Sequence, residues 1–189
     1  MENEIPTLYF PDRAGWRAWL NENFQTQKAI WFVFPLKAAG KAAVSYNDAV
    51  EEALCFGWID STVKALDATH KIQKFTPRNP ASSYSQSNIQ RLLWLRQQGL
   101  IHPAIREAAD KVLRLKFVYP PDIIAALKSD PEVWKNYNRC SESYRRIRIA
   151  YIEDARKRPA VFKKRLDHFI AVTKKGKLIT GYGGIAKYY

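Results

Sequence analysis

Apolar positions in the first part of the chain follow two spacings, one typical of strands and one typical of helices. The run AIWFVFPLK, which begins at Ala29, is almost wholly apolar and predicts a buried strand. Helices are expected after Asp12 and after Ser45, because both residues can cap a helix N-terminus and apolar residues follow them at helical spacing. Gly57 is expected to end the second of these helices.

A β-hairpin is predicted directly after Gly57. The segments WIDSTVKAL and HKIQKFTPR flank a polar turn, and both contain β-branched and aromatic residues that favour strands. A further short strand is expected at 8–10. The N-terminal part therefore predicts an α+β fold, with helices and a small antiparallel or mixed sheet.

From Ser85 onward the pattern becomes helical. The segment YPPD is expected to interrupt the helices, while other residues mark where helices begin or end. These markers are Gly99, Pro103, Asp130 with Pro131, Ser141, Pro159 and Gly176. We therefore divide the chain into an α+β domain at 1–118, a basic helical segment packed on it at 119–177, and a tail at 178–189.

The charge is concentrated in the C-terminal half. The chain has a formal net charge of +13; residues 1–100 contribute +2 of it and residues 101–189 contribute +11. Such an asymmetry favours polyanionic partners, either nucleic acid or an acidic protein. The alternative is that these side chains only form a solvated helical surface.

Six basic residues of the last two expected helices are the candidates for polyanion binding. On the helix after Ser141, Tyr144, Ile147 and Tyr151 share one stripe and are expected in the core, which leaves the basic residues on outward faces. Helix-turn-helix, OB and RNA-recognition signatures are not recognisable, so any nucleic-acid binding is expected to be non-specific. The candidates are Arg145, Arg148, Arg156, Lys163, Lys164 and Arg165.

The sequence does not favour export, a membrane span, a zinc site or a nucleotide-binding site. The acidic start MENEIP and the short apolar runs indicate neither an export signal nor a membrane span, which favours a cytoplasmic location. Cys55 and Cys140 lie far apart and the three histidines lack metal-ligand spacing, so we expect two reduced thiols and no zinc site. Nucleotide-binding loops and a GxSxG elbow are absent from the sequence, and no cofactor is expected.

Asp60 is the most informative polar residue of the predicted hairpin. Alternation along the strand places it on the same side as Trp58, where a carboxylate needs a partner, and Arg78 is the expected one. Polar residues at the following helix entrance could complete a small anion-binding pocket with Trp58 as its wall. The candidate ligand-binding residues are Trp58, Asp60, Arg78, Ser83, Ser85 and Asn88.

A structural role explains the same residues equally well. Asp60 and Arg78 could brace the hairpin, and Ser85 could simply cap the next helix. General acid-base catalysis requires a second titratable group at close range, and the segment offers only His70. Catalytic residues are therefore not assigned, and the protein is expected not to be an enzyme.

Three segments together resemble the bacterial YdeI/OmpD-associated family, also described as bacteriocin-protection proteins. They are SYNDAVEEALCFGWIDS, IQKFTPRNPASSYSQSN and SESYRRIRIAYIEDARKRPAVFKKRLDHFI, and the resemblance extends over about 31–177. It implies a small α+β protein with a helical C-terminal segment and a role in stress or bacteriocin protection, without an established catalytic mechanism.

The sequence thus leaves three functions open. The first is a non-enzymatic cytoplasmic protein of this family type that acts by binding a protein or an anionic ligand. The second is a nucleic-acid-associated protein that uses the basic C-terminal helices. The third is an enzyme with a polar site around Asp60 and Arg78.

Overall fold

The structure, a computed structural model, describes residues 4–36, 40–180 and 186–188. The chain divides into two units, one formed by Met1–Ser83 with Leu95–Lys111 and the other by Tyr84–Trp94 with Val112–Tyr189. Helix α3 (Gln86–Gln97) contributes residues to both units. The domain boundaries expected at 118 and 177 stay predictions, and part of the expected tail lies outside the described residues.

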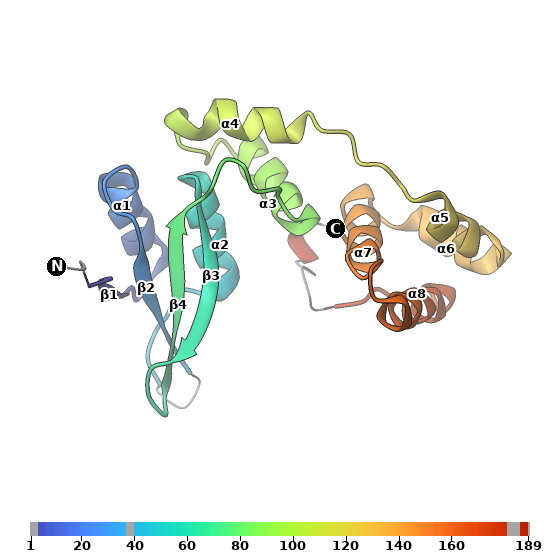
Figure 1. The fold of residues 1–189 in the computed structure, drawn as a ribbon, viewed down its shortest axis with the longest axis horizontal. Helices are drawn as coiled ribbons and strands as arrows, with labels where there is room; N and C mark the ends of the chain where they lie inside the picture. The colour runs from blue at the N-terminus through green and yellow to red at the C-terminus, as the bar shows by residue number, and fades with distance from the viewer. Residues whose placement is uncertain (1–3, 37–39, 181–185, 189) are drawn as a thin grey trace. The chain divides into compact units, whose positions relative to one another are not determined.

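The first unit contains a four-stranded mixed sheet. Its strands run in the order β1-β2-β4-β3 (Figure 1). β1 is parallel to β2, while β2 with β4 and β4 with β3 are antiparallel, so the hairpin predicted after Gly57 is confirmed. The α+β class is therefore confirmed. The strands are β1 (Thr7–Tyr9), β2 (Ile30–Pro35), β3 (Trp58–Ala65) and β4 (His70–Pro77).

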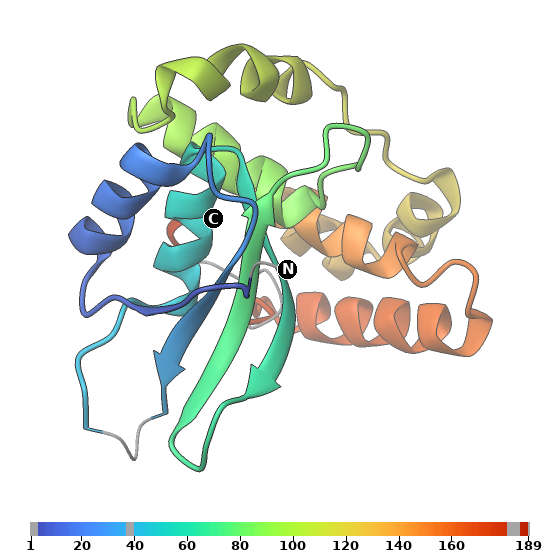
Figure 2. The ribbon, with the colours of Figure 1, turned by 60° about the vertical axis from the view of Figure 1, so that its left-hand side comes forward.

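Two helices, α1 (Arg13–Asn23) and α2 (Tyr46–Cys55), cover one face of this sheet (Figure 2). Both begin at the predicted caps, since Asp12 accepts a hydrogen bond from the Gly15 backbone N–H at 2.8 Å and Ser45 accepts one from Asp48 at 3.1 Å. Helix α4 (Pro103–Leu113) begins at the predicted first-turn proline.

Gly57 connects α2 to β3 in a conformation that requires glycine. Its φ is +71°, in the left-handed region that side chains disfavour. A Cβ at this position would also lie 3.0 Å from Cδ1 of Ile105. Because glycine has no side chain, it meets both constraints, and the chain passes from helix to strand without a linker.

Aromatic side chains fill the space between this helix layer and the sheet. Trp16 of α1 is fully buried, and its ring centroid lies 5.2 Å from that of Phe32 on β2 and 5.6 Å from that of Phe75 on β4. Trp58 is also fully buried, and its indole N–H donates to the Phe24 carbonyl at 3.0 Å. These contacts fix the start of β3 against α1.

The second unit consists mainly of helices. The caps predicted at Asp130 and Ser141 are confirmed, whereas YPPD, expected to interrupt the helices, supplies the start of an additional one. Proline suits a first helical turn because its missing N–H would have no partner there. The helices are α5 (Pro121–Lys128), α6 (Pro131–Arg139), α7 (Glu142–Glu153), α8 (Pro159–Lys174) and the short 3₁₀ helix η2 (Ala186–Tyr188).

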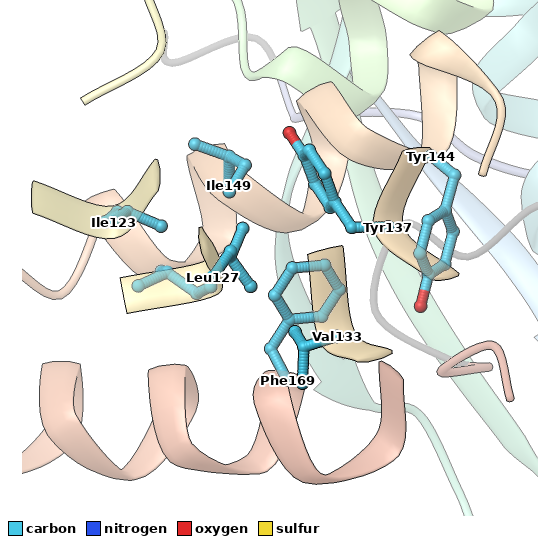
Figure 3. Packing of buried hydrophobic residues seen from close by; sticks show 8 residues of the cluster. Ile123, Leu127, Val133, Tyr137, Tyr144, Ile149 and Phe169 are labelled. Carbon is cyan, nitrogen blue, oxygen red and sulfur yellow. The ribbon is translucent and has the colours of Figure 1, made fainter. Parts of the chain in front are cut away.

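Helices α5 to α8 share one hydrophobic cluster (Figure 3). Phe169 of α8 lies near its centre, with ring centroids 6.3 Å from Tyr137 of α6 and 6.2 Å from Tyr144 of α7. Ile123 and Leu127 bring α5 into the same cluster. The basic helices α7 and α8 are therefore held by a core of their own.

Candidate functional site

Asp60 connects the sheet to α2. Its carboxylate accepts hydrogen bonds from the Tyr46 hydroxyl at 2.8 Å and from the Gln73 amide at 2.5 Å. Gln73 is buried on β4, and Tyr46 opens α2. Both donors bind the same carboxylate oxygen, Oδ2, and they come from two elements. These contacts are consistent with a structural role for Asp60 in the first unit.

Arg78, the expected partner of Asp60, lies just beyond the end of β4. Its backbone N–H donates to the Gly57 carbonyl at 2.8 Å, and its guanidinium donates to the Ser82 carbonyl. Asp60 faces Phe75 in the strand register. The register therefore places Arg78 opposite Gly57, and the ion pair between Asp60 and Arg78 stays a prediction.

The other candidates of this proposed pocket belong to two different units. Ser83 ends the first segment of the first unit, whereas Ser85 and Asn88 belong to the second. The Ser85 hydroxyl accepts from the Asn88 backbone N–H at 3.3 Å, and the Asn88 side chain accepts from Arg91 at 2.9 Å. These contacts give Ser85 its expected capping role, while the binding assignment of all six residues stays untested.

His70, the only titratable neighbour expected near Asp60, braces the hairpin turn. It pairs with Asp67 at 3.0 Å, and Asp67 also accepts from the Thr69 backbone N–H at 2.6 Å. The Thr69 N–H and the imidazole together lower the pKa of Asp67 to about 2. The imidazole is therefore engaged in a turn, where such contacts are structural.

A basic pocket of about 430 Å³ lies in the second unit, between α7, α8 and the segment at 179–180. Its apolar part is formed by side chains such as Ile152, Val161 and Phe169. Arg148, Lys164, Arg165 and His168 are the basic residues that line it, and none of its described lining residues is acidic. The basic pocket therefore combines apolar surface with positive charge, a combination suited to an anion with an apolar body.

Arg148 departs from the sequence-based expectation. The helical stripe placed it on an outward face, but only 2% of it is exposed. Its guanidinium carbon lies 5.6 Å from the centre of the buried Tyr144 ring, one helical turn earlier. Helix α7 also buries Ile149 and Ile152, so it is covered on more than the one side that the stripe predicts.

Arg165 is held in the basic pocket by an aromatic residue. Its guanidinium carbon lies 3.7 Å from the centre of the Tyr151 ring, and it donates a hydrogen bond to the Tyr151 carbonyl. Both partners are uncharged, so they orient the guanidinium without neutralising it. None of the described residues that line the pocket with Arg165 is acidic.

The structure separates the other three basic candidates from this pocket. Arg156 forms ion pairs with Asp122 and Glu153, both at 2.5 Å, and these hydrogen bonds raise its pKa. Lys163 pairs with Asp167 at 2.6 Å, and Arg145 lies 5.5 Å from the centre of the Tyr137 ring. The six basic residues therefore do not form one continuous surface of unneutralised charge.

The sequence interpretation overlooked His168 and the apolar part of the basic pocket. Val161, Lys164, Arg165 and His168 are spaced i, i+3, i+4 and i+7 along α8, which places them on one helix face. This spacing could have identified the helix face from the sequence. The opposing wall on α7 and at 179–180 depends on tertiary packing and could not.

Among the described residues, none of the helices is sufficiently long and apolar to span a bilayer. The same residues also contain no cluster of three or more histidine, cysteine, aspartate or glutamate side chains placed to hold a metal ion.

Comparisons with known proteins divide the chain into two matched parts. Residues 8–108, more than half of the chain, match the model of a family described as a domain of unknown function (DUF8412). The chain belongs to this family. No curated protein and no solved structure matches the chain.

The second match concerns the part that contains the basic pocket. Residues 116–176 match the family described as "Bacteriocin-protection, YdeI or OmpD-Associated", which confirms the resemblance expected from the sequence. The match covers α5 to α8, whereas the segments around GWIDS and FTPR lie within the first match. The resemblance is thus shown for the C-terminal helices rather than for the whole range 31–177.

Proposed function

We propose that this chain is a non-enzymatic bacterial protein of the bacteriocin-protection type, which acts in the cytoplasm by binding an anionic ligand in the basic pocket. The supporting observation is that Arg148, Lys164 and Arg165 converge on one cavity whose described lining contains no carboxylate. The apolar part of the pocket favours a ligand with an apolar body and one anionic group. The match at 116–176 covers most of the lining residues.

A nucleic-acid partner is less well supported by the same geometry. Duplex binding at physiological salt needs several unneutralised cations along an extended surface, because each phosphate contact adds only about 0.9 to the salt slope. Arg156 and Lys163 already pair with carboxylates. An enzyme site at Asp60 is also less well supported, since the Asp60 carboxylate accepts hydrogen bonds from Tyr46 and Gln73.

The first test uses anilinonaphthalene sulfonate, a fluorescent probe with an aromatic body and one anionic group. We expect saturable binding to the wild-type protein and about fivefold weaker binding to Lys164→Gln, because one charge-assisted contact is lost at an exposed position. A fluorescence titration gives both dissociation constants. Glutamine keeps the helix propensity of this position close to that of lysine.

Lys163→Gln is the matched control, since it removes the same charge from the adjacent residue, whose ammonium group pairs with Asp167 outside the pocket. Its affinity for the probe should stay within a factor of about two of the wild type. Equal weakening by both substitutions would contradict the proposal and indicate a diffuse electrostatic effect. The nucleic-acid alternative would be favoured if the wild type bound labelled duplex DNA at about 150 mM salt and both substitutions weakened this binding equally while leaving probe binding unchanged.

A further inference from the structure

A second cavity of the second unit, which we call the Thr173 pocket, has a volume of about 540 Å³. It lies where α6 ends, α7 begins and α8 ends. Its lining shares no residue with that of the basic pocket. The residues used below are Asn136, Arg139, Cys140, Ser141, Thr173 and Lys177.

The hydroxyl group of Thr173 is the feature that points to a ligand. Only 2% of this residue is exposed, and its buried oxygen has no hydrogen-bond partner among the described residues. A helical threonine commonly donates to the carbonyl one turn earlier, but this one does not. A buried hydroxyl without a partner is destabilising, so the site calls for a group that completes it.

The surroundings of this hydroxyl favour negative charge. Arg139 and Lys177 line the pocket, and no described lining residue is acidic. Ser141 caps α7, whose N-terminal N–H groups attract anions. The carbonyls at the end of α8, which would repel an anion, are engaged by the Asn136 amide, 3.1 Å from both the Thr173 and Lys174 oxygens.

We propose that the Thr173 pocket is a second binding site, for a small oxyanion such as a carboxylate or a phosphate group. The Thr173 hydroxyl donates to an anion oxygen, and Arg139 and Lys177 balance its charge. This site is independent of the basic pocket and of the function proposed for it.

Cys140 provides a reporter inside the Thr173 pocket. It is half-buried, and its thiol donates to the Asn136 carbonyl at 3.5 Å. Burial raises the pKa of this thiol, while Arg145 opposes that change. Because the thiolate is the form that reacts with alkylating reagents, a bound anion should slow the reaction by covering the thiol and by disfavouring its charge.

The experiment measures alkylation of Cys140 by iodoacetamide, a neutral reagent, with peptide mapping by mass spectrometry. Inorganic phosphate is the probe, and sodium chloride at the same ionic strength is the reference. We expect phosphate to slow alkylation of wild-type Cys140 by about threefold or more at saturation. Cys55 is fully buried, with its pKa raised to about 12, and its peptide serves as an internal record of global unfolding.

Thr173→Val tests the role of the hydroxyl, because valine keeps the shape and removes only the polar group. We expect it to abolish protection by phosphate while the melting temperature without phosphate stays equal or rises. Lys164→Gln, in the basic pocket, should leave the protection intact. Lack of protection in the wild type would mean that water alone satisfies the hydroxyl. The proposal would be overturned by this absence of protection in the wild type. It would equally be overturned if Thr173→Val kept the protection or had a lower melting temperature than the wild type.

Discussion

Replacing Arg13 by methionine is expected to lower the free energy of unfolding of the first unit by about 3 kcal/mol. Arg13 of α1 contacts three carboxylates of α2: Asp48 at 2.8 Å, Glu51 at 3.1 Å and Glu52 at 2.5 Å. Glu51 and Glu52 are 0% and 2% exposed. The substitution removes a positive charge from beside two buried carboxylates and keeps most of the side-chain volume, so the loss is electrostatic rather than a packing defect.

Arg13→Met leaves Arg17 as the remaining cation beside these carboxylates. Arg17 still contacts Glu52 at 2.6 Å, but its second nitrogen already donates to the Leu100 carbonyl at 2.8 Å. A single guanidinium then has to compensate carboxylates that two shared before. Hydrogen exchange of the α2 amides is the suitable measurement, because it reports the opening of this unit separately from the second one.

Glu52→Gln provides the control for this prediction. The double variant Arg13→Met/Glu52→Gln removes the buried carboxylate together with its partner. Its loss of stability should therefore be smaller, by about 1 kcal/mol, than the sum of the losses of the two single variants. If the losses of the two single variants add up to that of the double variant, Arg13 and Glu52 are not coupled. A loss below about 1 kcal/mol for Arg13→Met alone would show that the α1–α2 network contributes little to stability.

This network also shows what the sequence could not predict. Helix ends were predictable because caps act locally: Asp12, Ser45 and Ser141 each accept from a backbone N–H within three residues. Whether Glu51 and Glu52 are exposed depends on which face of α2 packs against α1. That choice is made by long-range contacts and leaves no local signal.

The candidate site follows the same division between local and long-range information. The basic character of α7 and α8 is visible in the sequence, and so is the helix face that contains Lys164, Arg165 and His168. Burial of Arg148 and neutralisation of Arg156 by Asp122 depend on how α5, α7 and α8 meet. Charge alone predicts a basic surface on these helices but not which of its residues share a pocket, and the polyanion-binding role of the six basic candidates stays a prediction.

Replacing Phe169 by alanine is expected to lower the free energy of unfolding of the second unit by about 3–5 kcal/mol. Phe169 is 1% exposed and packs near the rings of Tyr137 and Tyr144 in the cluster of Figure 3. Alanine removes the ring and leaves a cavity that three helices would have to close. The edge contact with the Tyr137 ring and the tilted contact with the Tyr144 ring are lost as well.

The same substitution should also weaken probe binding, because Phe169 lines the basic pocket. Hydrogen exchange of the α6 and α8 amides at increasing urea concentration measures the stability change of the second unit. Probe titration of the folded fraction in the absence of urea measures the change in binding. The two effects should appear together, since one ring supports both the core and the pocket.

Phe162→Ala is the matched control on the same helix. Phe162 is half-buried at the margin of the cluster, with the Arg156 guanidinium carbon 4.4 Å from its ring centre. Its loss should cost about 1–2 kcal/mol and leave probe affinity unchanged, because this side chain lies outside the described lining of the basic pocket. Equal costs for the two substitutions would contradict the placement of Phe169 at the centre of the core. Unchanged probe affinity in folded Phe169→Ala would show that the probe binds elsewhere.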